Sequence, residues 1–235
     1  MTAARSLAFI AAFYLWSILS GLAMLPLLLA RRKAMVRAMQ VWARVMVAML
    51  RPICGVNLEI RGLSHLPKGP ALIGAKHQCM FDTMGALLAF DDPCYVMKKE
   101  LMWIPFYGWF CAKAGMIVVD REGHSKALRK LLTEGQASLK AGRQLIIFPE
   151  GTRVAPGETG EYKPGIAALY RSGDLPCIPM ATNSGVHWPA HGFLRTPGTI
   201  VYEFLEPIPP GLPRPEFMRL LEERIEAGSK ALLGE

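Results

Sequence analysis

One stretch of the chain indicates both its fold and its chemistry, Gln144-Leu145-Ile146-Ile147-Phe148-Pro149-Glu150-Gly151-Thr152-Arg153. Its apolar first half is typical of a buried strand, and a polar turn follows. In that turn Gly151 permits close approach of the backbone, Thr152 offers a hydroxyl, and Arg153 can grip an anion through two parallel hydrogen bonds. The spacing lacks the Gly-x-x-x-x-Gly-Lys pattern of nucleotide P-loops, so we expect an anion site of another kind. An ordinary turn with a solvated arginine is the alternative.

A second polar stretch, Lys76-His77-Gln78-Cys79-Met80-Phe81-Asp82, follows the apolar run 71–75. On a regular helix, five residues of separation rotate two side chains apart by about 500°. A turn between a strand ending near Lys76 and a helix starting near Thr83 would instead bring His77 and Asp82 together. The carboxylate would then orient the imidazole, leaving its other nitrogen free to accept a hydroxyl proton. The alternative makes Asp82 a helix N-cap and His77 a strand-end residue bonded to backbone.

The rest of the chain beyond residue 52 alternates apolar runs with helical patterns. We expect strands at Val56–Arg61, Ala71–Lys76, Tyr95–Lys99, Met116–Asp120, Gln144–Phe148, Cys177–Ala181 and Thr199–Leu205. We expect helices at Thr83–Phe90, Ser125–Ala141, Gly165–Ser172 and Pro215–Leu232. This alternation predicts an α/β fold with a mixed, largely parallel sheet flanked by helices. Both polar stretches fall at carboxyl ends of strands, where such sheets bind ligands.

The N-terminal part predicts membrane attachment. No charged residue occurs between Leu7 and Ala30, and a helix of this length spans roughly 36 Å, more than the ~30 Å hydrocarbon core. A cleaved signal peptide needs an apolar run of only about 7–15 residues, so we expect a retained anchor. The cluster Arg31-Arg32-Lys33 then places the following chain on the cytoplasmic side.

The segment Ala34–Leu50 reads as a second membrane element. A polar stripe on this otherwise apolar helix suits the headgroup boundary; it consists of Arg37, Gln40, Arg44 and Arg51. We therefore expect a membrane-embedded two-helix segment at 1–52 and an α/β domain at 53–235. The first helix either spans the bilayer or folds with the second into a hairpin in one leaflet.

Charge and cysteine usage narrow the partners. With 27 Lys and Arg against 19 Asp and Glu, the net charge of +8 favours an anionic partner. Basic residues concentrate beside the apolar helices and no nucleic-acid motif is present, so we expect membrane phospholipids and no nucleic acid. Five cysteines without a Cys-x-x-Cys pair argue against a disulfide framework or a thiolate zinc site. His187 and His191 have metal-like spacing, but Pro189 opposes a helix there, and we expect no metal.

Three further features are open. Arg121 ends a predicted strand and would either contact a phosphate or form a surface ion pair. Cys79 lies near His77, yet no separate base is visible for it, so a small buried thiol is favoured over a nucleophile. A group of aromatic residues would border an acyl channel or the membrane interface, or would pack in the core: Trp103, Phe106, Tyr107, Trp109 and Phe110.

Four ordered blocks of the chain resemble those of the 1-acylglycerol-3-phosphate acyltransferase (PlsC-like) family. The blocks are His77–Asp82, Gly115–Arg121, Phe148–Arg153 and Ile178-Pro179. The likeness covers roughly 57–209, and the two polar motifs in this order are specific. One departure is Cys79, which stands where the family often has serine.

The resemblance implies transfer of a fatty acyl group from acyl-CoA or acyl carrier protein to the sn-2 hydroxyl of lysophosphatidic acid, giving phosphatidic acid. It assigns His77 as general base, Asp82 as its partner, and an acceptor-phosphate site to Glu150, Gly151, Thr152 and Arg153, with Arg121 assisting. It implies no metal or organic cofactor, and a location at the cytoplasmic face of a membrane, the bacterial inner membrane. Alternatives are another acceptor, glycerol-3-phosphate or a lyso-ornithine lipid, or a non-catalytic lipid-binding protein.

Overall fold

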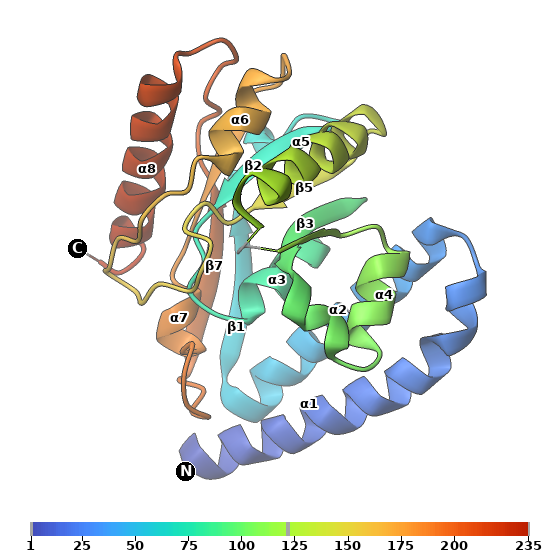
Figure 1. Ribbon diagram of the computed structural model, residues 1–235. Helices are drawn as coiled ribbons and strands as arrows, with labels where there is room; N and C mark the ends of the chain where they lie inside the picture. Colours follow the sequence, from blue (N-terminus) through green and yellow to red (C-terminus); the bar gives the residue numbers. More distant parts are fainter. Residues whose placement is uncertain (1, 121–122, 235) are drawn as a thin grey trace.

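A seven-stranded sheet forms the centre of the molecule within the residues that the computed structural model describes, 2–120 and 123–234, with the side chains of residues 86 and 124 left aside. The strand order is β1-β7-β6-β2-β5-β3-β4 (Figure 1). The bounds are β1 Val56–Arg61, β2 Ala71–Ala75, β3 Pro93–Lys98, β4 Ile117–Val119, β5 Gln144–Ile147, β6 Cys177–Thr182 and β7 Gly198–Phe204. Described neighbours pair in parallel except β6 and β7. The predicted mixed, largely parallel sheet is confirmed, each strand end lying within two residues of its predicted place.

The burial of the central strands explains why their apolar runs predict strands correctly. Every residue of β2 and β5 is buried, because helices cover both faces of the sheet. Successive side chains point to opposite faces, so Ile146 joins one hydrophobic cluster and its neighbour Leu145 the other. In the register of β2 with β5, Gly74 pairs with Ile147, so both strands deliver their following residues to one edge of the sheet.

Helices form one layer on each side of the sheet (Figure 1). On one side lie α5 His124–Lys140, α6 Gly165–Arg171 and α8 Arg214–Ala231. On the other lie α1 Thr2–Met24, α2 Arg32–Cys54, α3 Phe81–Ala89 and α4 Tyr107–Lys113. Short segments complete the chain: the one-turn helix α7 Ser184–His187 and the 3-10 turns η1 Leu25–Leu29, η2 Leu63–His65 and η3 Lys99–Trp103. The four helices predicted in the α/β part are confirmed, and α4 and α7 are additions.

Helix α2 packs into the hydrophobic cluster that covers one face of the sheet. Its buried residues Met35 and Met46 belong to the same hydrophobic cluster as Ile73 of β2. Gln40 is buried and donates to the carbonyl oxygens of Leu87 (3.2 Å) and Phe90 (2.8 Å). Its predicted place in a headgroup stripe is therefore wrong, because it satisfies the open carbonyls at the end of α3. The boundary after residue 52 stays a prediction.

Helix α1 crosses the base of the molecule (Figure 1). The helical segment Thr2–Leu29 is long and apolar enough to cross a membrane, by length and composition. Its inner side packs against the protein: Phe9 is buried, and the backbone at Gly21 lies close to the Phe106 ring. The outer side exposes a row of large apolar residues, Leu7, Tyr14, Leu15, Ile18, Leu19 and Leu22. Embedding of the two-helix segment in a membrane stays a prediction.

Candidate active site

His77 and Asp82 meet at the carboxyl end of β2. His77 lies in the turn after the strand, and Asp82 is the second residue of α3. Nδ1 of His77 is 2.9 Å from Oδ2 of Asp82, so the turn brings the two side chains together as the sequence predicts. The Nε2 atom of His77 has no hydrogen-bond partner among the described residues, and 14% of the side chain is exposed. The imidazole thus offers a free nitrogen at the surface and a carboxylate behind it.

The Asp82 carboxylate is fully buried and saturated with donors. Oδ2 also accepts from the backbone N–H groups of Gln78 (2.7 Å) and Cys79 (2.8 Å). Oδ1 accepts from the hydroxyls of Ser184 (2.5 Å) and Tyr202 (3.1 Å). Burial alone raises the pKa of Asp82, but the donors and the neighbouring imidazole outweigh it and hold the pKa below its ordinary value. Asp82 therefore stays ionised and cannot simply take the proton from the imidazole.

Ser184 and Tyr202 are site residues that sequence reasoning missed. Ser184 begins α7, just beyond the carboxyl end of β6, and Tyr202 lies within β7. They stand 102 and 120 residues from Asp82 in sequence. The one signal in the sequence was that Ser184 follows the predicted strand Cys177–Ala181.

The loop after β5 lies against the His77 turn. The backbone N–H of Val154 donates to the carbonyl oxygen of His77 at 2.8 Å, which places the preceding residue Arg153 beside the histidine. Arg153 and Thr152 are exposed, and Arg153 makes no hydrogen bond or ion pair with any described residue. Gly151 has a φ of +67°, in the left-handed region that favours glycine. The loop thus brings the backbone of Arg153 to the His77 turn, with an exposed guanidinium that acts electrostatically on Tyr107.

Phe148, the first residue of that loop, stacks on the imidazole. The ring centroids of His77 and Phe148 are 4.2 Å apart, and the ring planes are inclined by 25°. One face of the imidazole is therefore covered by an apolar ring, which fixes the plane of the histidine.

Glu150 turns inward rather than toward the exposed loop surface. Its Oε1 accepts from Nζ of Lys76 at 2.7 Å, and its Oε2 accepts from the backbone N–H of His77 at 3.1 Å. The side chain is buried, and burial raises the pKa of Glu150 despite the nearby ammonium. A direct role of its carboxylate on an acceptor phosphate stays untested, but its contacts support the turn that carries His77.

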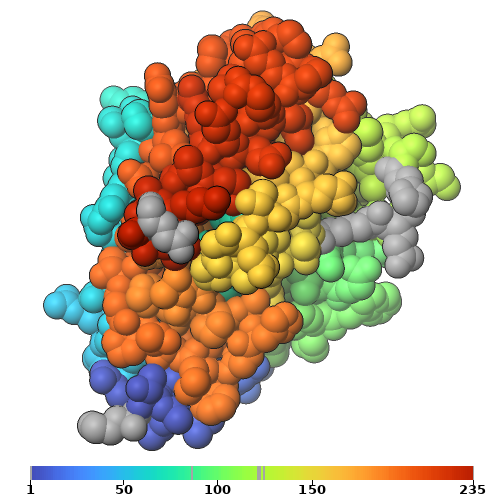
Figure 2. Space-filling view, turned by 90° about the vertical axis from the view of Figure 1, so that its left-hand side faces the viewer, coloured from blue at the N-terminus to red at the C-terminus, as the bar shows by residue number. Residues whose placement is uncertain are grey.

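Lys76 is the centre of a buried polar cluster that extends to α8. Its ammonium donates to Glu226 at 2.8 and 2.9 Å and to the carbonyl oxygen of Glu158 at 2.8 Å. Tyr162 also donates to Glu226, at 2.8 Å. The loop 148–164, yellow in Figure 2, lies against red α8. Helix α8 is thereby tied to the loop that carries Arg153.

The other candidate residues from the sequence lie in different environments. Cys79 is buried, and its pKa is raised well above the ordinary value by burial and by the Asp82 charge, so it is held as a thiol. Among the aromatic residues, Phe110 is buried, whereas Trp103 and Trp109 are exposed. Arg121 lies outside the described residues. The predicted lack of a metal stays a prediction.

Comparison with known proteins agrees with this geometry. Residues 57–183, more than half of the chain, match the family model described as Acyltransferase. The chain is 38% identical over 161 residues to the 1-acyl-sn-glycerol-3-phosphate acyltransferase of Pseudomonas aeruginosa, covering 68% of this chain and 63% of that protein. It is 27% identical over 185 residues to the human 1-acyl-sn-glycerol-3-phosphate acyltransferase alpha, covering 77% and 65%.

The fold has a solved counterpart as well. The crystal structure of the 1-acyl-sn-glycerophosphate (LPA) acyltransferase, PlsC, from Thermotoga maritima matches with a TM-score of 0.83 at 22% identity, covering 100% of this chain and 99% of that one. The alignments to the two curated relatives span less than two thirds of those proteins. The family match contains the His77–Asp82 turn and the loop after β5. The chain belongs to the acyltransferase family.

Proposed function

We propose that this protein transfers a fatty acyl group from a thioester to the sn-2 hydroxyl of 1-acylglycerol-3-phosphate, producing phosphatidic acid. The observation that carries the proposal is the His77–Asp82 pair beside the unpaired Arg153. A base with one free nitrogen suits a hydroxyl acceptor, and an exposed guanidinium suits a phosphomonoester. The relatives carry the name of this activity, which supports the same acceptor.

In the proposed mechanism Nε2 of His77 accepts the proton of the acceptor hydroxyl. The oxygen forms a bond to the thioester carbonyl carbon, and the carbon–sulfur bond breaks as the carbonyl is restored. The departing thiolate takes the proton from Nε2, so the imidazole returns to its neutral form. Asp82 supports the imidazolium that forms between these steps. No covalent acyl-enzyme is required, in keeping with the buried, protonated Cys79.

The acceptor phosphate is proposed to bind Arg153, assisted by Thr152 and the backbone around Gly151. Glu150 acts through the turn that it holds, by its bond to the backbone of His77. Arg121 is proposed as a further phosphate contact on the basis of its place after β4. Neither a metal nor an organic cofactor enters this scheme.

Membrane binding is proposed through α1 and the aromatic residues near it. The outer side of α1 is apolar, while its inner side packs into the protein core through Phe9 and Met24. We propose that α1 lies in one leaflet, because crossing the bilayer would separate this inner side from the core. Trp103 and Trp109, both exposed, suit the interfacial region. The catalytic part then lies at the cytoplasmic face, beside the cationic residues after α1.

The test is a donor and acceptor panel with the purified full-length protein in detergent. Lysophosphatidic acid with acyl-CoA or with acyl carrier protein should yield phosphatidic acid and free thiol. The His77→Ala variant should bind to liposomes as the wild type does but release no thiol. Product absent with both donors would refute the proposal, and an active His77→Ala variant would remove the assigned base.

The same panel separates the other candidates. Glycerol-3-phosphate keeps the phosphomonoester but has no acyl chain, and a lyso-ornithine lipid keeps the chain but lacks the phosphate that Arg153 should bind. A preference for either would change the acceptor while retaining the chemistry. Liposome binding without acceptor-dependent thiol release would favour a non-catalytic lipid-binding protein.

A further inference from the structure

We propose that Ser184 and Tyr202 are positioning residues that hold the Asp82 carboxylate in the orientation that directs the free nitrogen of His77 to the acceptor hydroxyl. The inference rests on the proposed function and adds two hydroxyls to its machinery. Neither residue lies in the two motifs, and Tyr202 lies outside the matched segment 57–183.

The two hydroxyls fix one oxygen of the carboxylate, as the turn fixes the other. Oδ2 is held by His77 and by two backbone N–H groups of its own turn. Within the turn, Oδ1 receives only a long contact from Sγ of Cys79 (3.8 Å), so the local bonds hold this oxygen weakly. Ser184, at the start of α7, and Tyr202, in β7, donate to Oδ1 at 2.5 and 3.1 Å. These two bonds fix the second oxygen of the carboxylate. All three side chains are buried, so no water competes for these bonds.

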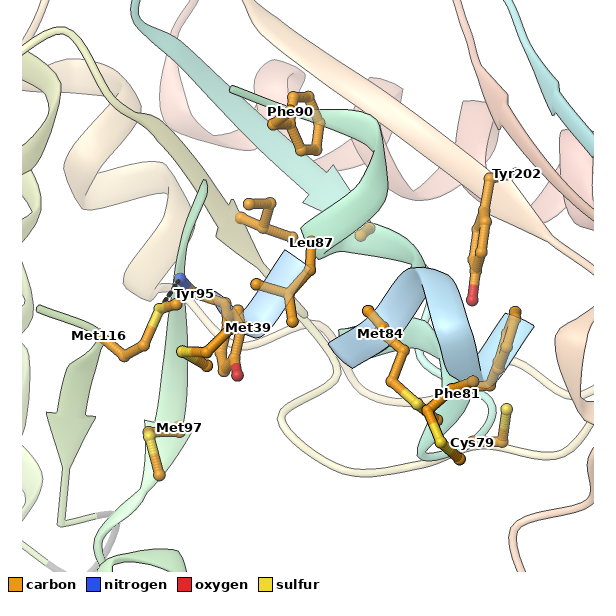
Figure 3. Close-up of a cluster of buried hydrophobic side chains, with 14 of the residues drawn as sticks. Met39, Cys79, Phe81, Met84, Leu87, Phe90, Tyr95, Met97, Met116 and Tyr202 are labelled. Carbon is orange, nitrogen blue, oxygen red and sulfur yellow. Dashed lines mark hydrogen bonds between the residues drawn. The ribbon is translucent and has the colours of Figure 1, made fainter. Parts of the chain in front are cut away.

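The fold makes specific room for the phenol of Tyr202. A Cβ atom at Gly85 of α3 would lie 2.1 Å from Cε2 of Tyr202, so only glycine lets the ring pass the helix. The ring then stacks against Phe81, with centroids 6.2 Å apart and planes inclined by 9°. Figure 3 shows the hydroxyl end of Tyr202 directed toward Phe81 and Cys79 at the start of α3.

The backbone around Ser184 is also fixed by hydrogen bonds and close packing. Its backbone N–H donates to Oγ1 of Thr182 at 3.1 Å, and the next N–H, of Gly185, donates to Oε1 of Gln78 at 2.9 Å. A Cβ atom at Gly185 would lie 3.0 Å from Cβ of Gln78, so the α7 segment sits tightly on the His77 turn. The hydroxyl of Ser184 is thereby fixed relative to the carboxylate that it serves.

The charged groups around the pair define the expected pH behaviour. Asp82 contacts His77, the neutral thiol of Cys79 and the neutral phenol of Tyr202, because burial raises the pKa of the last two. On the backbone side of His77 lie Glu150 and Lys76, and Arg153 follows on the loop; Arg195 lies further out, where it acts electrostatically on Cys79. Each hydroxyl draws negative charge of Asp82 away from the imidazole. Removing one should therefore stabilise the imidazolium and move the acid limb of kcat/KM to higher pH.

The test compares Tyr202→Phe, Ser184→Ala and the double variant with hydroxyl controls elsewhere. Tyr170→Phe removes a buried phenol that donates to the carbonyl oxygen of Pro209, and Ser138→Ala removes a half-buried hydroxyl on α5 that contacts the thiol of Cys94. We expect each site variant to lose about tenfold in kcat, with the acid limb displaced upward and the acceptor KM little changed. The controls should keep the wild-type pH profile, and Ser184→Thr, which retains a hydroxyl, should recover most of the rate.

A second measurement does not depend on turnover. In protein labelled with ¹⁵N-histidine, the His77 resonances, assigned through His77→Gln, should titrate at higher pH in Tyr202→Phe than in wild type and in Tyr170→Phe. Equal titration and an unmoved pH profile in both site variants would overturn the inference, even if the rate falls. Wild-type protein that makes no phosphatidic acid would refute the proposed function instead, while the titration would still decide whether the hydroxyls act on His77.

Discussion

The ring of Phe148 covers one face of the His77 imidazole, with 4.2 Å between the ring centroids. This contact links the two motifs through their side chains, in addition to the backbone bond from Val154. An aromatic face also attracts a cation, so the contact would favour the imidazolium of the proposed proton transfer.

Replacing Phe148 by leucine tests that contact. We expect Phe148→Leu to lower kcat by up to about tenfold and to move the acid limb of the pH profile downward, because the imidazolium loses the aromatic face. Phe148→Tyr should retain most of the rate. The measurement is kcat against pH, and an unchanged profile in Phe148→Leu would show that the ring serves packing alone.

Asp82→Asn should lower kcat by roughly 10²–10⁴-fold with little change in acceptor KM. The neutral amide cannot stabilise the imidazolium. Its NH2 group must also replace one of the two carboxylate oxygens, where it would face donors such as the Ser184 hydroxyl instead of accepting from them. Initial rates at saturating acceptor measure the loss, and circular dichroism monitors the fold. Activity within a few-fold of wild type would exclude the carboxylate from proton transfer.

Arg153→Ala should raise the KM for lysophosphatidic acid by about 10–100-fold, as expected for lost hydrogen bonds to a charged phosphate, with a smaller effect on kcat. Arg171→Ala is the matched control, since Arg171 is an exposed arginine at the end of α6. Rates over a range of acceptor concentrations give both constants. Equal KM values in the two variants would move the anion site away from Arg153.

Glu226→Gln should loosen the loop that carries Arg153, because Lys76 and Tyr162 lose their charged partner on α8. We expect a loss of about 1–3 kcal/mol in the free energy of unfolding and a raised acceptor KM. Glu223→Gln on the exposed side of α8 breaks only a surface pair with Arg219 and should change stability by less than about 0.5 kcal/mol. Thermal unfolding and acceptor titrations of both variants decide the point.

The two ion pairs that Asp92 forms, with Arg32 and Arg143, should make the free energy of unfolding depend on pH. Partial burial raises the pKa of Asp92, but the two guanidinium groups outweigh it, and the pKa is lowered overall. A carboxyl with a lowered native pKa stabilises the fold above its unfolded pKa of about 3.9 and loses that contribution as pH falls further. Wild type should therefore melt above Asp92→Asn at pH 7, and the difference in Tm should shrink below about pH 4. A difference that is constant with pH would contradict the charge pairing.

The sequence predicted the sheet well because its central strands are buried on both faces. The runs before His77 and Phe148 are therefore continuously apolar and end abruptly in polar residues. The His77–Asp82 pair was predictable for the same reason, since a strand end and a helix start leave only a short turn between them. Local patterns were enough wherever the contact is local.

Contacts across the chain were missed because no local pattern marks them. Ser184 and Tyr202 reach Asp82 through strand order, and Glu226 reaches Lys76 from 150 residues away. Gln40 was misassigned for a related reason: its helical position lies near Arg37 and Arg44, but its partners are carbonyls of α3. Helix α4 was missed because it begins after a γ-turn at Phe106, where φ is +64° and the N–H of the next residue bonds the carbonyl oxygen of the residue before.

Helix α1 shares a hydrophobic cluster with the sheet. This affects how a water-soluble form of the protein could be engineered. Cutting away α1 would remove Phe9 and Met24 from the core and uncover Trp188, against which Phe9 packs, and the part of α2 that contacts α1, so truncation would expose a new apolar surface. Polar substitutions confined to Leu15, Ile18, Leu19 and Leu22 leave that interior intact. The helix is a structural part of the protein, and only its outer side is open to redesign.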